Sequence, residues 1–312
     1  MASISAVIPT WNGLEMLKCA VESLRRGRRV PDQVVIVDNG SSDGTSEWAK
    51  SEGLDVVRFP GNRGFAAAVN AGVEASRGEL VFLLNNDIEC EPDCLAVLEQ
   101  AAIANEWAAS FAPMITQWDS GLVMQVGVGL RPDFFAIPLG SSQPPGMWRR
   151  PAEVFGPSGA ACLLRRGVLE AVGGFPEEFF AYYEDVDFAA RCRLAGYRCM
   201  YVPEAVVRHI GAATSRRLGW RVPYMSARNQ IWTLARCCPA RLLPRLWKVL
   251  IRGQLVNLLT AAREGHLIPT ALGKAAAILG IYRELRERSR IQRGCTSAEE
   301  FYRWVMEPVR EL

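Results

Sequence analysis

Short apolar runs alternate with segments of helical spacing over the first 90 residues, and this alternation constrains the fold more than any other feature. Four runs are predicted to be strands, at residues 4–8, 33–37, 56–59 and 80–84. Predicted helices follow the first three runs: residues 14–24, where apolar residues recur at helical spacing, residues near 46–51, after a turn-rich segment, and the Ala-rich residues 65–75. Such alternation builds βαβ units with right-handed crossovers, which predicts an α/β fold with a mostly parallel sheet flanked by helices.

Polar residues follow the carboxyl end of each predicted strand. They are Thr10, Asp38, Arg63 and Asp87. In open sheets of this kind, ligands bind beyond the carboxyl ends of the strands. We therefore expect one crevice to collect these side chains. The turn-rich segment after Asp38 contains Ser and Asp residues that are suited to cap the helix near residues 46–51.

Composition indicates a globular chain of 312 residues, with 49% apolar and 22% charged residues. The nine cysteines are odd in number and include the adjacent pair Cys237 and Cys238, which favours free thiols in a reducing compartment. The first apolar run ends at Pro9, too early for a secretory signal, and no later run reaches the ~18 uninterrupted apolar residues of a spanning helix. We expect a cytoplasmic location.

Charge is divided unevenly along the chain. Residues 1–214 hold 18 Lys and Arg against 26 Asp and Glu, whereas residues 215–312 hold 18 against 7. The C-terminal part is predicted to be mostly helical. Its basic excess predicts contact with an anionic partner, such as phospholipid head groups or a phosphate-bearing acceptor. Residues 113–157, rich in Gly and Pro, are expected to form mobile loops over the site.

A basic amphipathic helix is predicted near residue 245. Arg241, Arg245, Lys248 and Arg252 fall within about 60° of one another on a helical wheel. On the other side we expect the apolar residues Leu243, Leu246, Trp247 and Leu250. Two interpretations remain open at this point: a helix packed on the domain with a solvated basic face, or a helix that binds an anionic membrane surface.

Three acids gather within the four positions 184–187, in the aromatic segment that runs from Gly173 to Phe188. They are Glu184, Asp185 and Asp187, placed where a helix begins. Glu184 and Asp187 either complement the helix dipole or take part in chemistry. A carboxylate at Asp185 that faces the crevice could accept the proton of an incoming hydroxyl as a general base.

These ordered motifs resemble family 2 of the GT-A glycosyltransferases, in particular the bacterial rhamnosyltransferase-like branch. The resemblance runs from about residue 4 to residue 215. It is carried by the segments 6–13, 35–45, 61–72, 83–87, 158–161 and 184–185. It implies the GT-A (nucleotide-diphospho-sugar transferase) fold over residues 1–215, with a nucleotide-sugar half at about 1–112 and an acceptor and base half at about 113–215. Residues 216–312 would then form a basic, mostly helical extension.

The resemblance also implies roles for residues on the donor side. Thr10 and Asp38 would touch the base and ribose of the donor, and Asn62 or Arg63 would lie near the nucleotide. Asn86 belongs to the segment where the family carries its Asp-x-Asp motif.

In that motif Asn85 replaces the first acid, which leaves Asp87 as the expected ligand of a divalent metal, Mg²⁺ or Mn²⁺. The family carries a His after the Glu-Asp pair, and the likeness makes His209 a metal or diphosphate contact. A lone His is otherwise more often structural. A divalent cation held by hard oxygens would neutralise the diphosphate leaving group.

By the same likeness the chain is an inverting hexosyltransferase with Asp185 as catalytic base beside Glu184. The donor would be dTDP-L-rhamnose first and a UDP-sugar second. The acceptor would be a polyprenyl-diphosphate-linked sugar or a growing glycan of a bacterial surface polysaccharide, reached from the inner face of the cytoplasmic membrane. No nucleic acid partner is expected.

Two rival functions fit the sequence less well. A nucleotidyltransferase would require a Gly-rich phosphate loop after the first strand, and residues 9–13 do not form one. A catalytically silent scaffold that binds nucleotide sugar or membrane suits the basic C-terminal part, but the joint presence of Asp87, Asp185 and His209 argues for an active enzyme.

Overall fold

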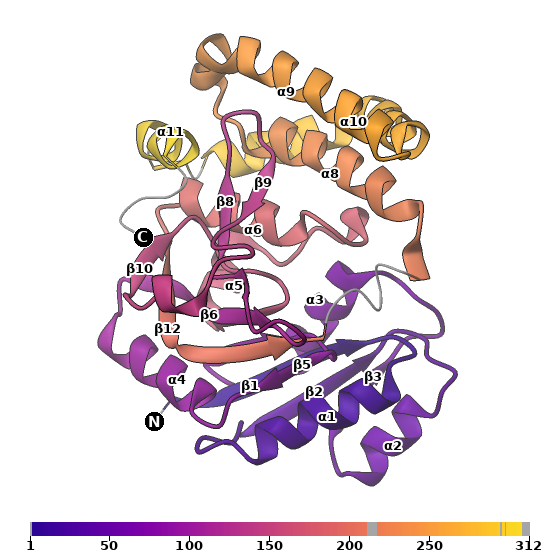
Figure 1. Cartoon of the computed structure of the whole chain (residues 1–312), viewed down its shortest axis with the longest axis vertical. Coiled ribbons are helices and arrows are strands. Elements are labelled where there is room, and N and C mark those ends of the chain that lie inside the picture. Colours follow the sequence, from indigo (N-terminus) through magenta and orange to yellow (C-terminus); the bar gives the residue numbers. More distant parts are fainter. Residues whose placement is uncertain (1, 211–216, 294, 297, 308–312) are drawn as a thin grey trace.

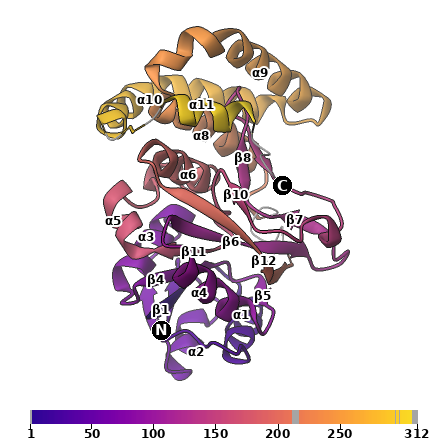
Figure 2. The ribbon, with the colours of Figure 1, turned by 90° about the vertical axis from the view of Figure 1, so that its left-hand side faces the viewer.

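The computed structural model describes residues 2–210, 217–293, 295–296 and 298–307. A mixed sheet crosses the molecule, with strand order β10-β12-β6-β11-β4-β1-β2-β3. Helices cover both faces of this sheet, and a further helical layer lies beyond one of the covered faces (Figures 1 and 2). The predicted α/β class with a helical C-terminal region is confirmed.

The N-terminal half is the parallel part of the sheet. Its strands are β1 (Ile4–Thr10), β2 (Gln33–Asp38), β3 (Asp55–Arg58) and β4 (Leu80–Leu84). Strand β1 pairs in parallel with both β2 and β4, and β3 extends β2 in parallel. The connecting helices are α1 (Leu14–Arg25), α2 (Thr45–Ser51) and α3 (Phe65–Ala75). All seven elements lie where the apolar patterns predicted them.

The predicted cap of α2 is wrong in detail. Gly44, with a φ of 85°, occupies the N-cap position, and none of the Ser or Asp side chains caps the helix there. The neighbouring Asp43 instead joins two segments, because its carboxylate accepts hydrogen bonds from the backbone N–H groups of Leu14 and Thr45. A left-handed residue at the helix entry suits Gly because it carries no Cβ.

The second half of the sheet is built from strands of both directions. Its long strands are β6 (Ala108–Gln117), β11 (Ala161–Arg165) and β12 (Arg198–His209). Strand β11 runs antiparallel to β4 and β6, and β12 runs parallel to β6. Its short strands are β5 (Ile88–Cys90), β7 (Val123–Gln125) and β10 (Ala152–Val154). Strands β8 (Val128–Leu130) and β9 (Ala136–Pro138) form a separate antiparallel pair.

Residues 113–157 differ from the expectation of loops over the site. They contain the end of β6, the strands β7 to β10 and the short helix η1 (Pro145–Met147). Trp148 of this segment and Tyr201 of β12 belong to one apolar cluster, which is separate from the other cores. Short paired strands explain the abundance of Gly and Pro, since these residues mark the turns between them.

Two apolar cores lie on the two faces of the sheet. Helices α1 and α4 (Cys94–Ala104) pack on one face. Helices α3, α5 (Arg166–Val172) and α6 (Glu184–Leu194) pack on the other. The nine cysteines are all free thiols, as their number and scatter predicted.

The C-terminal helices form the outer layer on the α6 side (Figure 2). They are α8 (Arg221–Cys237), η3 (Ala240–Leu242), α9 (Leu243–Arg263), α10 (Leu267–Arg293) and α11 (Ala298–Met306). One apolar core joins Phe134, Phe155 and α6 to Leu246 and Trp304. The division proposed at residue 215 falls outside the described residues and remains a proposal. Within the described chain, no helix is both long enough and apolar enough to cross a bilayer.

Candidate active site

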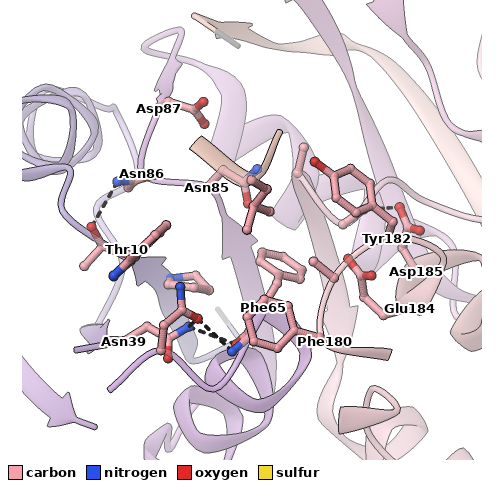
Figure 3. A pocket seen from close by; sticks show the side chains of 18 of the residues that line it. Thr10, Asn39, Phe65, Asn85, Asn86, Asp87, Phe180, Tyr182, Glu184 and Asp185 are labelled. Atoms are coloured by element: carbon pink, nitrogen blue, oxygen red, sulfur yellow. Dashed lines mark hydrogen bonds between the residues drawn. The ribbon is translucent and has the colours of Figure 1, made fainter. Parts of the chain in front are cut away.

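A cavity of about 290 Å³ opens where the carboxyl ends of β1 and β4 meet the loop before α6 (Figure 3). Predicted site residues that line it are Thr10, Asn62, Asn86, Asp87, Glu184, Asp185 and His209. Asp38 and Arg63 are not among the described lining residues. None of the described lining residues comes from 113–157, so this segment does not form the walls of the cavity.

Thr10 and Asn86 form one wall, at the ends of two adjacent parallel strands. The amide nitrogen Nδ2 of Asn86 donates a 2.9 Å hydrogen bond to Oγ1 of Thr10. Both side chains are buried. Gly13 lies so close to Asn86 that a Cβ at position 13 would overlap the amide. This wall is therefore preorganised by strand register together with a close backbone approach.

Asn39 is a lining residue that the sequence analysis did not single out. Its Nδ2 donates to Oδ1 of Asn62 at 3.1 Å and to the carbonyl of Gly64 at 3.0 Å. Its Oδ1 accepts a 2.8 Å hydrogen bond from the backbone N–H of Arg63. Because Asn39 directly follows β2, the same rule that selected Asp38 could have found it.

Asp38 and Arg63 have other partners in this structure. Asp38 is fully buried, and its carboxylate accepts hydrogen bonds from the backbone N–H of Ser41 and from the hydroxyl of Ser46. Arg63 is exposed and pairs with Glu177 at 3.2 Å. The roles predicted for these two residues at the donor remain predictions. The structure itself gives Asp38 the task of ordering the loop after β2.

Asp87 and His209 lie together although 122 positions separate them. Strand β12 pairs antiparallel with β5, which places His209 opposite Ile88, the residue after Asp87. The imidazole Nε2 lies 2.9 Å from Oδ1 of Asp87, and Nδ1 lies 3.1 Å from the sulfur of Met124. The strand pairing thus brings a carboxylate oxygen and an imidazole nitrogen to the rim of the cavity.

The donor set of this pair fits a divalent cation that shares its coordination with substrate. Within the described residues, no group of three or more His, Cys, Asp or Glu side chains forms a metal cage. Mg²⁺ is typically held by one or two protein carboxylates together with substrate phosphates and waters. Asp87 with His209 supplies such a partial set. A cation bound here would therefore need further ligand atoms from the substrate.

Asp185 lies across the cavity from Asp87 (Figure 3). Its Oδ2 accepts a 2.9 Å hydrogen bond from the backbone N–H of Gly159, and its Oδ1 accepts one of 2.8 Å from Val186. Burial raises the pKa of Asp185, while these two backbone donors oppose the rise. The carboxylate is thus held in one orientation and has a higher proton affinity than a solvated Asp.

Glu184 lines the same cavity and is more buried than Asp185. Among the described residues its Oε2 is buried without a hydrogen-bond partner. Burial, and next the neighbouring charge of Asp185, raise the pKa of Glu184 well above its ordinary value. An unpaired carboxyl oxygen in a cavity is available to a ligand hydroxyl, since leaving it unpaired is unfavourable.

The backbone just before these carboxylates is strained. Phe180, Tyr182 and Tyr183 have φ values of 66°, 70° and 69°, which non-glycine residues rarely adopt. Gly64, at the start of α3, allows the close approach, since a Cβ there would lie 2.5 Å from the carbonyl oxygen of Phe180. The N–H of Ala66 donates to the same oxygen at 3.2 Å. Such strain persists only where the surroundings hold it.

Helix α8 clamps this loop through hydrogen bonds from two of its side chains to backbone carbonyls of the loop. Asn229 is fully buried, and its Nδ2 lies within hydrogen-bond distance of three loop carbonyls: Phe179 at 3.0 Å, Ala181 at 3.0 Å and Tyr182 at 2.7 Å. Arg228 adds a hydrogen bond of 3.0 Å to the carbonyl of Phe179. The sequence analysis missed both residues. A single Asn within a helix has no spacing or motif that would have marked it.

Asp187 has a structural role, which decides between the two interpretations left open for it. It is fully buried and pairs with Arg191 at 2.6 Å and with Arg236 at 3.2 Å. Arg191 also donates to the carbonyls of Gly173 and Gly174. The Asp187 carboxylate therefore links α6 to α8 and, through Arg191, to the segment at Gly173 and Gly174, and it does not line the cavity in the described structure.

A family model for glycosyl transferase family 2 matches residues 5–173, and a model for glycosyl transferase family group 2 matches residues 133–295. A curated relative is 30% identical over 241 residues, which cover 69% of this chain and 78% of the relative. It is the N-acetylglucosaminyl-diphospho-decaprenol L-rhamnosyltransferase of Mycobacterium tuberculosis. This chain belongs to glycosyl transferase family 2, is a glycosyltransferase, and resembles the rhamnosyltransferase branch, as its motifs predicted.

Solved structures confirm the GT-A fold. GalNAc-T7, determined with UDP, GalNAc and Mn²⁺, superposes with a TM-score of 0.68 at 14% identity, over 97% of this chain and 56% of that chain. The mannosyltransferase PcManGT of Pyrobaculum calidifontis, in complex with GDP-Man and Mn²⁺, superposes with a TM-score of 0.55 at 20% identity. The superposition covers 97% of this chain and 87% of the mannosyltransferase chain. At these identities the likeness concerns the fold.

Proposed function

We propose that this glycosyltransferase moves a sugar from a nucleotide-diphosphate donor to an acceptor hydroxyl in a single displacement with inversion. The observation that carries the proposal is the position of two groups in one cavity. Asp87 and His209 lie on one side, and Glu184 and Asp185 lie on the other (Figure 3). One side is suited to hold a leaving diphosphate and the other to receive a proton.

The donor occupies the wall formed by the strand ends in this proposal. The polar side chains of Thr10, Asn39, Asn62 and Asn86 face the nucleotide, with Asp38 ordering the loop behind them. Asp87 and His209 would hold a divalent cation, Mg²⁺ or Mn²⁺. When bound, such a cation neutralises the charge that develops on the diphosphate.

Asp185 acts as the general base. The acceptor oxygen forms a bond to the anomeric carbon while the bond from that carbon to the diphosphate oxygen breaks, and the hydroxyl proton passes to the Asp185 carboxylate. Attack from the face opposite the leaving group inverts the configuration. We assign to Glu184 a hydrogen bond from a sugar hydroxyl, because its Oε2 is buried without a partner in the described structure.

The similarity to an L-rhamnosyltransferase that is named for an N-acetylglucosaminyl-diphospho-decaprenol acceptor supports dTDP-L-rhamnose as donor, with a UDP-sugar as second choice. It supports a polyprenyl-diphosphate-linked sugar as acceptor more than a free growing glycan. In this proposal residues 1–215 form the catalytic domain, and the protein works peripherally on the inner face of the cytoplasmic membrane in surface polysaccharide synthesis.

A thermal-shift panel tests the donor site without an acceptor. The panel compares dTDP, UDP and GDP, each with and without Mg²⁺ or Mn²⁺, because a ligand at ~100 times its Kd adds ~2.7 kcal/mol of stability. We expect metal-dependent stabilisation by dTDP or UDP. It should disappear in Asp87→Ala and persist in Asp119→Ala, which removes an exposed acid in the turn between β6 and β7.

Two outcomes would contradict parts of the proposal. No stabilisation of the folded protein by any nucleotide would refute the donor site. Tight donor binding with neither transfer nor hydrolysis over hours would favour the silent scaffold. Product anomeric configuration, read by NMR of the glycoside formed from dTDP-L-rhamnose or the UDP-sugar that binds, decides whether the reaction inverts.

A further inference from the structure

Helix α10 turns an almost uncharged apolar face outward. Between Leu267 and Tyr282 the only charged residue is Lys274, which is half-buried. The exposed large side chains along this stretch are Leu267, Ile268, Leu272, Ile278, Leu279 and Tyr282. Ile268 is 74% exposed and Leu279 is 87% exposed. An apolar face of this extent, open to water, marks a surface that meets a partner.

Helix α9 has three faces rather than the two that the sequence suggested. Its buried residues are Leu246, Leu250, Gly253 and Ala261. An exposed apolar stripe at four-residue spacing comprises Leu243, Trp247, Ile251, Leu255 and Leu259. Its exposed basic row comprises Arg245, Lys248 and Arg252, and α9 itself has no acidic residue. Arg245 pairs with Glu299 of α11 at 3.0 Å, so Lys248 and Arg252 are the members of the row that have no carboxylate partner among the described residues. At about 100° per residue, the apolar stripe lies between the packed face and the basic row.

The prediction of a single apolar side opposite the basic residues of this helix is therefore only half correct. Leu246 and Leu250 pack in the core as predicted, with Leu246 2% exposed. Leu243 and Trp247 do not, and Trp247 is 53% exposed. The interpretation of a packed helix with a merely solvated basic face leaves this stripe unexplained.

We propose that the exposed apolar residues of α9 and α10, with the basic row of α9, form a docking surface for an anionic lipid bilayer. The two helices contact each other and lie at the end of the molecule opposite α1 and α2 (Figure 1). Apolar side chains enter the bilayer interface, and basic side chains meet lipid phosphates. The surface is argued from exposure and charge alone, while its link to a lipid-linked acceptor rests on the proposed function.

Charge complementarity identifies the partner. Residues 240–282 carry six Lys and Arg against one Glu, a composition that suits lipid phosphates. A second copy would bring the same positive excess against this one. Trp247 and Tyr282, both exposed, are the residue types that favour a membrane–water boundary. Lys248 lies with its Nζ 5.5 Å from the Trp247 ring centre, so the apolar and basic parts adjoin.

Vesicle co-sedimentation of the full chain tests this surface. Vesicles of phosphatidylcholine alone are compared with vesicles that also contain phosphatidylglycerol. We expect binding to the anionic vesicles that weakens as salt increases. The double variant Leu272→Ser/Leu279→Ser should lose on the order of ten-fold in affinity per side chain. Lys248→Glu/Arg252→Glu should lose at least about five-fold per charge.

The matched control is Ile103→Ser, which removes an equally exposed apolar side chain from α4, outside the C-terminal helices. It should bind vesicles like the parent. Nucleotide stabilisation of every variant, measured as above, shows that the fold and donor site are intact, so that failure of docking is distinguished from failure of the proposed function.

Absence of binding to anionic vesicles overturns the proposal, as does equal loss in the Ile103 control. Equal binding to both vesicle types, insensitive to salt and to the charge reversals, overturns the assignment to anionic lipid. A dimer by light scattering that Leu272→Ser/Leu279→Ser dissociates, without vesicle binding, would assign the surface to a second copy instead.

Discussion

The two sides of the cavity are positioned by different means. On the donor side, Thr10, Asn39 and Asn86 stand at the ends of neighbouring parallel strands, and the register that pairs Thr10 with Asp38 aligns those ends. On the base side, Glu184 and Asp185 follow a strained loop that belongs to no strand. The donor side is built by local pattern and register, whereas the base side depends on contacts from distant elements.

This difference predicts that residues 179–183, the base loop before Glu184, control chemistry, whereas the strand ends control nucleotide binding as well. Damage to the base loop should reduce turnover while nucleotide binding survives. Damage at the strand ends should reduce both. Helix α8 lies in the C-terminal region, yet through Asn229 it contacts the loop that directly precedes Glu184 and the proposed base Asp185. The C-terminal helices therefore take part in the geometry of the active site.

Asp185→Asn should give the largest effect. It keeps the size of the side chain but removes the proton acceptor, so transfer should fall by ~10²-fold or more. Nucleotide stabilisation should remain, since the donor side is unchanged. Steady-state transfer, measured beside the thermal-shift panel, checks this. Turnover within a few-fold of the parent would remove Asp185 from the role of base, and a large loss in Glu184→Gln alone would give that role to Glu184.

The pH dependence of transfer sharpens the same prediction. Because burial raises the pKa of Asp185, the carboxylate loses its proton at a higher pH than a solvated Asp. The rising limb of kcat/KM against pH should therefore lie above the ordinary range of an Asp and should be absent in Asp185→Asn. A rising limb that persists in the variant would assign it to another group.

Asn229→Ala should give the next largest effect. The substitution leaves the carbonyls of Phe179, Ala181 and Tyr182 without this donor and lets the strained loop relax. Misplacement of a reacting group by about 1 Å can cost up to ~10²-fold, so we expect kcat to fall on the order of ten- to a hundred-fold with little change in nucleotide affinity. The free energy of unfolding should also drop by about 1–3 kcal/mol.

Gln292→Ala is the matched control for Asn229. Gln292 also donates to backbone carbonyls of the C-terminal region, those of Arg236 and Cys237, but it does not contact the base loop in the described structure. It should lose stability without the loss of kcat. Equal losses of kcat in both variants would mean that general loosening of the C-terminal helices, and not the clamp by Asn229, limits turnover.

Gly64→Ala should destabilise the fold more than Gly53→Ala. Both glycines have positive φ, 92° and 71°, which Ala rarely adopts, and Gly64, with a ψ of 166°, lies in a region that is essentially confined to glycine. At Gly53 the added Cβ meets open space, whereas at Gly64 it would lie 2.5 Å from the carbonyl oxygen of Phe180. We expect an additional loss of about 1–3 kcal/mol at Gly64, read from urea midpoints. Equal midpoints would show that the loop moves away without cost.

Glu184→Gln should give the smallest effect, a change in how stability depends on pH. The raised pKa means that folded Glu184 keeps its proton at a pH where the unfolded chain has lost it. Its contribution is therefore lost as pH rises from the ordinary pKa of Glu to the raised one. Relative to the variant, the parent should become less stable over this window. Parallel curves of thermal midpoint against pH would contradict the raised pKa.

Much of the fold and part of the site could be predicted from the sequence. The four parallel strands, their helices and the strand-end residues Thr10 and Asp87 follow from short-range patterns of apolar and polar residues, and Asn86 follows from the resemblance to the family. Residues 113–157 were misjudged because short strands with many turns resemble loops in a sequence. The sequence did not separate the exposed apolar stripe of α9 from its buried row. Periodicity alone does not tell which of two apolar rows packs in the core.

The alternation of elements, the polar edge of the parallel sheet, the acids at the start of α6 and the basic excess of the C-terminal region are already present in the order of the residues. The contacts of His209 with Asp87, of Gly64 with the carbonyl of Phe180 and of Asn229 with the base loop arise from tertiary packing. The physical reason is how far apart along the chain the contributing residues lie. Periodicity and strand ends are written into neighbouring residues, whereas these contacts arise when segments more than a hundred positions apart, or in the case of Asn229 some fifty, are packed together.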